Sequence, residues 1–160
     1  MIHFEEIEKE IIGFGFEIVF KDFRRPWGGF LVINESQVQD FANKFFDGLN
    51  TDLIKIDGKL SPKILIINPN SKLSWQYHRR RAEVWRVYRG NVGISKSMDD
   101  NENPMMILRE NEQVKLKQGE RHRLIGLDNF SVVSEIWLHT DSESPSDEND
   151  IVRISDDYGR

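Results

Sequence analysis

The feature that most constrains the fold of this sequence is a series of short β-rich runs separated by turn residues. The runs cover residues 16–20, 30–33, 64–67, 83–88, 92–97, 105–108, 114–116 and 132–138. Asn-Pro, Gly and Asp-rich turn signals separate many of them at near-regular spacing. This spacing is typical of a β-sandwich or β-barrel and not of alternating strands and helices. We therefore expect a mainly β fold.

Two amphipathic stretches favour short helices in the N-terminal part of the chain. Apolar side chains in residues 4–11 share one helical face, and Gly13 predicts the end of that helix. Apolar side chains recur every three or four positions in residues 38–49, with Ser36 and Gln39 spaced as a capping box. Both stripes predict helices that pack against a core.

Length and composition exclude several classes of protein. The 160 residues fit one domain, and a formal net charge of -5 argues against nucleic-acid binding. The absence of cysteine excludes disulfides and thiolate metal sites. No run approaches the roughly 18 apolar residues of a membrane helix, and the acidic N-terminus does not resemble a secretory signal. We expect a cytoplasmic protein that binds neither nucleic acid nor membrane.

The chain is expected to form a single domain over residues 1–160. Residues 1–50 are predicted to be a helical N-terminal extension that packs on the barrel. The acidic stretch 141–150 contains several serines and a proline, which is typical of a solvated linker or flap. Residues 151–160 regain apolar and aromatic side chains, so we expect a tail that docks on the domain.

Residues 70–90 contain the most informative pattern. Ser74, Gln76 and His78 alternate, so on a strand their side chains point to one face. Glu83 opens the next β-rich run, which we expect to pair with the first as an antiparallel hairpin. His122 comes from a distant segment. Gln76, His78, Glu83 and His122 are therefore candidate ligands of a divalent metal ion.

Each candidate ligand also has a structural interpretation. A lone histidine on a strand is more often a hydrogen-bonded packing residue, but two of the four histidines fall within this pattern. A carboxylate in an apolar strand is costly unless it is paired or metal-bound. Ligands without sulfur suit zinc, which is our first expectation, and also Mn, Fe, Co or Ni.

The same residues resemble the two motifs of the cupin superfamily. In the first motif Asn replaces a turn glycine and Gln replaces the first histidine, and in the second Lys replaces a proline. The matching positions are Asn70, Gln76, His78, Glu83 and Gly90, then Lys117, Gly119 and His122. The resemblance implies a single cupin (double-stranded β-helix or jelly-roll) barrel that binds metal, preceded here by two short helices.

A narrower resemblance points to the C-terminal cupin domain of type II mannose-6-phosphate isomerases. It rests on residues 25–28, 73–78, 81–85, 119–124 and 150–160. This resemblance implies a metal-dependent aldose–ketose isomerase acting on mannose 6-phosphate and fructose 6-phosphate. The resemblance to cupins of this size implies a homodimer. The alternatives are a non-catalytic cupin that binds a sugar or sugar nucleotide and, third, a metal-dependent dioxygenase, which the replacement of a histidine by Gln76 disfavours.

The isomerase resemblance also suggests roles for further residues. Glu135 aligns with a glutamate of those enzymes and is the candidate base, with an ion pair to an arginine as its alternative role. A sugar phosphate requires cationic side chains near the ligands. The candidates for phosphate binding are Arg80, Arg81, Arg123 and Arg153.

Overall fold

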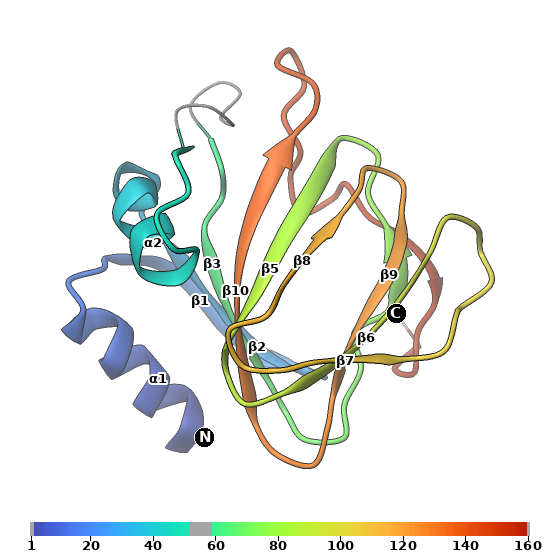
Figure 1. Ribbon diagram of the computed structural model, residues 1–160, viewed down its shortest axis with the longest axis horizontal. Coiled ribbons are helices and arrows are strands. Elements are labelled where there is room, and N and C mark those ends of the chain that lie inside the picture. The colour runs from blue at the N-terminus through green and yellow to red at the C-terminus, as the bar shows by residue number, and fades with distance from the viewer. Residues whose placement is uncertain (1, 52–58, 160) are drawn as a thin grey trace.

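The computed structural model describes residues 2–51 and 59–159 and has the form of a β-barrel with helices against one side (Figure 1). The helices are α1 (Ile2–Gly13) and α2 (Val38–Phe45), and the 3₁₀ helix η1 (Glu35–Gln37) precedes α2. The strands are β1 (Ile18–Arg25), β2 (Gly28–Ile33), β3 (Lys63–Ile67), β4 (Trp75–Tyr77), β5 (Arg81–Arg89), β6 (Val92–Ser97), β7 (Met106–Leu108), β8 (Gln113–Leu116), β9 (Arg121–Gly126), β10 (Ser131–His139) and β11 (Val152–Ser155).

The described strands form two antiparallel sheets. One has the order β1-β2-β3-β10-β5-β8, and the other has the order β11-β4-β9-β6-β7. The expectation of a mainly β barrel with two short N-terminal helices is confirmed. None of the helices in residues 2–51 or 59–159 is long and apolar enough to span a membrane.

Two apolar cores lie on opposite faces of the six-stranded sheet. Strand β3 supplies both, because its side chains alternate between the faces. Leu65 and Ile67 belong to the core inside the barrel, together with Trp85. Ile64 and Ile66 belong to the outer core, which α1 and α2 cover with the apolar stripes seen in the sequence. All five residues of β3 are accordingly buried.

The start of α2 differs from its prediction. A 3₁₀ turn contains Ser36, and the side chain of Asn34 accepts a hydrogen bond from the Ser36 N–H at 2.9 Å. The side chain of Gln39 binds Asn43 and Thr51 instead of the helix N-terminus. The predicted capping box is therefore wrong, because the extra turn shifts the first residue of α2 to Val38.

The expected hairpin between β4 and β5 is also wrong. Strand β4 pairs with β9 and β11, whereas β5 pairs with β10 and β8 in the other sheet. The chain crosses between the sheets after Tyr77, and His78 lies in this crossover. The candidate ligands therefore face one another across the barrel interior and not along one surface.

The terminal regions contribute more to the barrel than their composition suggests. Residues 1–50 include β1 and β2 of the six-stranded sheet as well as the helices. Residues 141–150, here called the strap, contain buried Ser146 and Asp150 and so pack against the barrel. Beyond the strap, β11 lies beside β4, with Arg153 opposite Gln76.

Candidate metal centre and cavity

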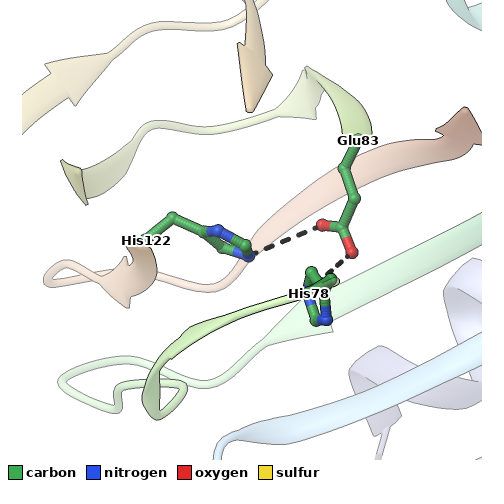
Figure 2. Close-up of side chains that lie close together, drawn as sticks. All are labelled: His78, Glu83 and His122. Carbon is green, nitrogen blue, oxygen red and sulfur yellow. Dashed lines mark ion pairs between the residues drawn. The ribbon is translucent and has the colours of Figure 1, made fainter. Parts of the chain in front are cut away.

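Three of the candidate ligands meet inside the barrel (Figure 2). The Nε2 atom of His78 lies 3.0 Å from Oε1 of Glu83, and Nε2 of His122 lies 3.8 Å from Oε2. One potential ligand atom from each residue lies within 4.8 Å of the others, and all three residues are buried. Glu83 comes from β5 and His122 from β9, so the two sheets jointly form the cluster.

Backbone carbonyls orient both imidazoles. Nδ1 of His78 lies 2.7 Å from the carbonyl oxygen of Asp150, and Nδ1 of His122 lies 2.9 Å from that of Glu120. A carbonyl oxygen only accepts hydrogen bonds, so each Nδ1 carries the hydrogen. Both Nε2 atoms therefore point at Glu83, an arrangement common among histidines that bind metals.

The charges of the cluster favour the protonation states that metal ligands require. Burial raises the pKa of Glu83, but the charges of His78 and Arg81 outweigh it and hold that pKa well below its ordinary value. Burial lowers the pKa of His122 to about 4, against the opposing charge of Glu83. Near neutral pH the cluster thus contains a carboxylate and a neutral imidazole, which are the forms that bind metal ions.

The donor atoms fit a divalent cation. Oε2 of Glu83 and Nε2 of His122 are buried and have no hydrogen-bond partner among the described residues. Unpaired buried polar atoms are costly, and a cation between them would satisfy both. Gln76 lies directly opposite His122 in the sheet, and its Oε1 accepts a hydrogen bond from Ser74 at 2.5 Å. The fourth-ligand role of Gln76 stays a prediction.

Arg81 is part of this cluster. Its Nε donates to Oε1 of Glu83 at 2.8 Å, and its Nη2 lies 3.3 Å from Nε2 of His78. The guanidinium also stacks 3.6 Å from the centre of the Trp137 ring. This fixed positive charge keeps Glu83 ionised and weakens the attraction of the cluster for a cation.

A cavity of about 510 Å³ adjoins the cluster and contains Glu83 and Gln76 in its wall. The other wall residues are aromatic, charged or apolar, apart from the polar Asn149: Arg25, Trp27, Phe30, Lys63, Leu65, Leu73, Arg81, Trp85, Glu135, Trp137, Glu148, Asn149, Ile151 and Arg153. Strand register explains the placement of Glu135. On β10 it lies opposite Lys63 of β3 on one side and Trp85 of β5 on the other.

Two indoles hold the carboxyl group of Glu135. Trp85 donates its Nε1–H at 2.7 Å, and Trp137 donates its Nε1–H at 2.9 Å to the other oxygen. Burial, reinforced by the negative charge of Glu83, raises the pKa of Glu135 to about 7. Among the described residues, the side-chain hydrogen bonds to Glu135 therefore come from two tryptophans. The sequence had suggested an ion pair with an arginine as the alternative to a catalytic role.

Comparison with known proteins agrees with the geometry. Residues 48–156 match the family model described as mannose-6-phosphate isomerase C-terminal. The chain belongs to this family. Solved structures of similar fold include the capsular polysaccharide assembling protein CapF of Staphylococcus aureus, at 15% identity and a TM-score of 0.55 over 84% of this chain and 33% of that one. Hazelnut vicilin has 16% identity and a TM-score of 0.56 over 86% and 33%. These likenesses show the cupin-type fold.

The curated relatives of this chain are longer proteins. The xanthan biosynthesis protein XanB of Xanthomonas campestris is 30% identical over 68% of this chain and 22% of its own length. The alginate biosynthesis protein AlgA of Pseudomonas aeruginosa is 29% identical over 78% and 24%. The mannose-1-phosphate guanylyltransferase of Escherichia coli is 27% identical over 89% and 24%. The chain thus spans less than a quarter of these relatives, and its family is one of mannose-phosphate metabolism.

The four candidate phosphate-binding arginines of this chain divide into two that line the cavity and two that do not. Arg81 and Arg153 line the cavity. Arg80 does not, because β4 ends at Tyr77 and the alternation stops there; its side chain instead donates to Ser144 at 2.9 Å. Arg123 directly follows the inward-facing His122 on β9, so its side chain points to the opposite face of the strand and lies outside the cavity. Its partners there are Glu102 and Ser155, each at 3.4 Å. Roles for Arg80 and Arg123 stay predictions that these contacts do not support.

Some residues of the candidate site were not singled out from the sequence. Lys63 and Arg25 line the cavity, and the carbonyl of Asp150 orients His78. Lys63 could have been found, because it stands two positions before Leu65 and so shares its inward face. The role of Asp150 depends on its backbone, which leaves no signal in the residue type.

Proposed function

We propose that this chain is a metal-dependent aldose–ketose isomerase that interconverts mannose 6-phosphate and fructose 6-phosphate. The observation that carries the proposal is the carboxyl group of Glu135, whose pKa is about 7 and which faces the same cavity as Glu83 of the metal cluster. Membership of the mannose-6-phosphate isomerase C-terminal family supports the choice of sugar phosphate.

The reaction moves a proton between C2 and C1 of the open-chain sugar through an enediol. A base works best when its pKa lies near the working pH, and burial gives Glu135 such a pKa. In our proposal Glu135 removes the proton from C2 and returns it to C1, while the hydroxyl proton on O2 passes to O1. The indoles of Trp85 and Trp137 hold the carboxylate in place during both transfers.

His78, Glu83 and His122 would hold the metal ion, with Gln76 as a further candidate ligand. When bound, a divalent ion acts as a Lewis acid on the carbonyl and hydroxyl oxygens of the sugar. Trp85 and Trp137 flank the buried carboxyl group of Glu135, and burial strengthens electrostatic interactions at this group. Zinc is the first candidate, because nitrogen and oxygen donors suit it.

The second candidate function is a non-catalytic cupin that binds a sugar or sugar nucleotide. It is favoured by the ion pair between Arg81 and Glu83, which partly neutralises the ligand carboxylate. The Escherichia coli relative is named for a guanylyltransferase activity, and this chain spans only 24% of it. Such a short part of a longer enzyme suits a binding role.

A coupled assay of fructose 6-phosphate formation from mannose 6-phosphate tests the proposal. We expect turnover by metal-loaded protein, loss of turnover after chelation, and recovery when the metal is restored. Calorimetric binding of the sugar phosphate, without turnover under any metal loading, would support the binding module and reject the isomerase.

A further inference from the structure

Lys63 is a buried lysine in the wall of the cavity. Its side chain is only 7% exposed, and its Nζ lies 4.0 Å from the centre of the Trp137 ring and 5.2 Å from that of Phe30. An ammonium group in such a position is costly unless an anion accompanies it. Its ion-pair partner is the carboxylate of Glu148, which comes from the strap.

Glu148 differs from its partner in exposure. Its side chain is 62% exposed, although it also forms part of the cavity wall. The strap is held on either side of it. Ser146 and the carbonyl of Asp147 accept hydrogen bonds from Arg81, and Asp150 accepts them from the backbone of residues 79 and 80. These anchors fix the strap while leaving the Glu148 side chain itself half in solvent.

This asymmetry makes the carboxylate of Glu148 exchangeable. Returning an exposed carboxylate to water costs little, whereas leaving a buried ammonium unpaired costs much more. The low-cost event is therefore the replacement of Glu148 by another anion that enters the cavity. We propose that Lys63 is an anion-binding residue of this cavity, and that the Glu148 carboxylate occupies the anion position beside Lys63 until the phosphate group of a ligand displaces it.

The position of Lys63 suits a small molecule that reaches the metal cluster. Lys63 lies opposite Glu135, and Glu83 lies opposite Trp137, two residues further along β10. Standard sheet dimensions then put the Cα atoms of Lys63 and Glu83 about 12 Å apart, and both side chains point into the cavity. A sugar phosphate could thus place its phosphate at Lys63, its reacting carbons beside Glu135 and its oxygens towards the cluster.

The choice of a phosphorylated sugar rests on the proposed function, whereas the anion site itself does not. Inorganic phosphate, mannose 6-phosphate and unphosphorylated mannose are therefore the probes, titrated into the full chain by calorimetry. The variants are Glu148→Gln, Lys63→Met and a matched control, Glu143→Gln. The control removes the same charge from an exposed strap residue that does not line the cavity.

We expect Glu148→Gln to bind inorganic phosphate and mannose 6-phosphate roughly fivefold more tightly than the wild type, and mannose no differently. Lys63→Met should weaken binding of both phosphates roughly tenfold or more and should abolish the gain from Glu148→Gln. Lys63→Arg keeps the charge and replaces Lys63→Met if the latter does not fold; in that background Glu148→Gln should still tighten binding.

Equal phosphate affinities for Glu148→Gln and Glu143→Gln would overturn the proposal, and so would a weaker affinity for Glu148→Gln. Glu148→Gln removes the ion-pair partner of the buried Lys63, so circular dichroism and urea unfolding first check that the variant is folded. Binding that depends on Lys63 but leads to no isomerisation would reject the proposed function alone. Isomerisation with no effect of Glu148→Gln would reject this inference alone.

Discussion

The imidazole of His78 donates a hydrogen bond from Nδ1 to the backbone carbonyl of Asp150 over 2.7 Å. The carboxylate of the same aspartate accepts the N–H groups of Arg79 at 2.9 Å and Arg80 at 3.0 Å. It also accepts the hydroxyl of Ser146 at 2.6 Å. One residue of the strap therefore fixes both the crossover that contains His78 and the direction of its Nε2 atom.

Asp150→Ala should weaken metal binding without removing any ligand. Loss of the side-chain anchor frees the crossover, so His78 no longer points steadily at Glu83. Loss of such supporting contacts typically costs 10- to 100-fold in metal affinity, and we expect about 10-fold here. Titration with Co²⁺, followed by its visible absorption, measures the change. Asp141→Ala is the control, because Asp141 accepts two backbone N–H groups elsewhere in the strap; equal losses in both variants would contradict this role.

The pH dependence of activity should follow Glu135. A general base acts in its ionised form, so kcat/KM should rise with pH and level off above about 7. Glu135→Gln keeps the shape of the side chain but cannot accept the proton, and it should lower kcat roughly 100-fold or more. A pH profile of the coupled assay checks both statements. An unchanged profile in the variant would remove Glu135 from the reaction.

The same carboxyl group should make stability fall as pH rises. The folded protein raises the pKa of Glu135 from 4.5 to about 7, so it holds this proton more tightly than the unfolded chain. The resulting stabilisation is complete below pH 4.5 and is lost as pH rises towards 7. Between pH 5 and 8 the wild type should lose roughly 2 to 3 kcal/mol of unfolding free energy relative to Glu135→Gln. Urea unfolding of both proteins measures this difference, and parallel pH curves would contradict it.

Two of the candidate phosphate-binding arginines, Arg153 and Arg123, should have different kinetic effects when substituted. Arg153 lines the cavity, so Arg153→Ala should raise KM for mannose 6-phosphate roughly tenfold. Arg123 bonds to Glu102 and Ser155 outside the cavity, so Arg123→Ala should change KM less and lower stability by about 1 kcal/mol. Michaelis–Menten measurements and urea unfolding on both variants check this order; a larger KM effect at Arg123 would reverse the assignment.

The sequence predicted which residues meet in the candidate metal cluster better than it predicted the surfaces around that cluster. Spacing and the cupin motifs identified His78, Glu83 and His122, because such motifs specify which residues converge. Alternation along a strand shows which side chains share a face but not which strand lies next to it, so β4 and β5 were wrongly paired. Alternation applied to β9 would have shown that Arg123 points away from the face of His122.

Other features of the site depend on contacts that no local pattern encodes. The ion pair of Lys63 with Glu148 joins residues 85 positions apart. The strap appeared to be a solvated linker because its composition is acidic. Its buried residues nevertheless make specific contacts: Ser146 accepts a hydrogen bond from Arg81, and Asp150 accepts backbone N–H groups. Composition describes the average environment of a segment, whereas the function here depends on two or three of its residues.

Metal content is the most direct test of the cluster formed by His78, Glu83 and His122. The full chain is loaded with Zn²⁺ or Co²⁺, passed through a desalting column, and analysed by plasma mass spectrometry. We predict a nearly equimolar amount of metal in the wild type and in His3→Ala, which changes an exposed histidine, and very little in His122→Ala. A wild-type protein that retains no divalent metal, or a His122→Ala variant that retains it fully, would contradict the central claim.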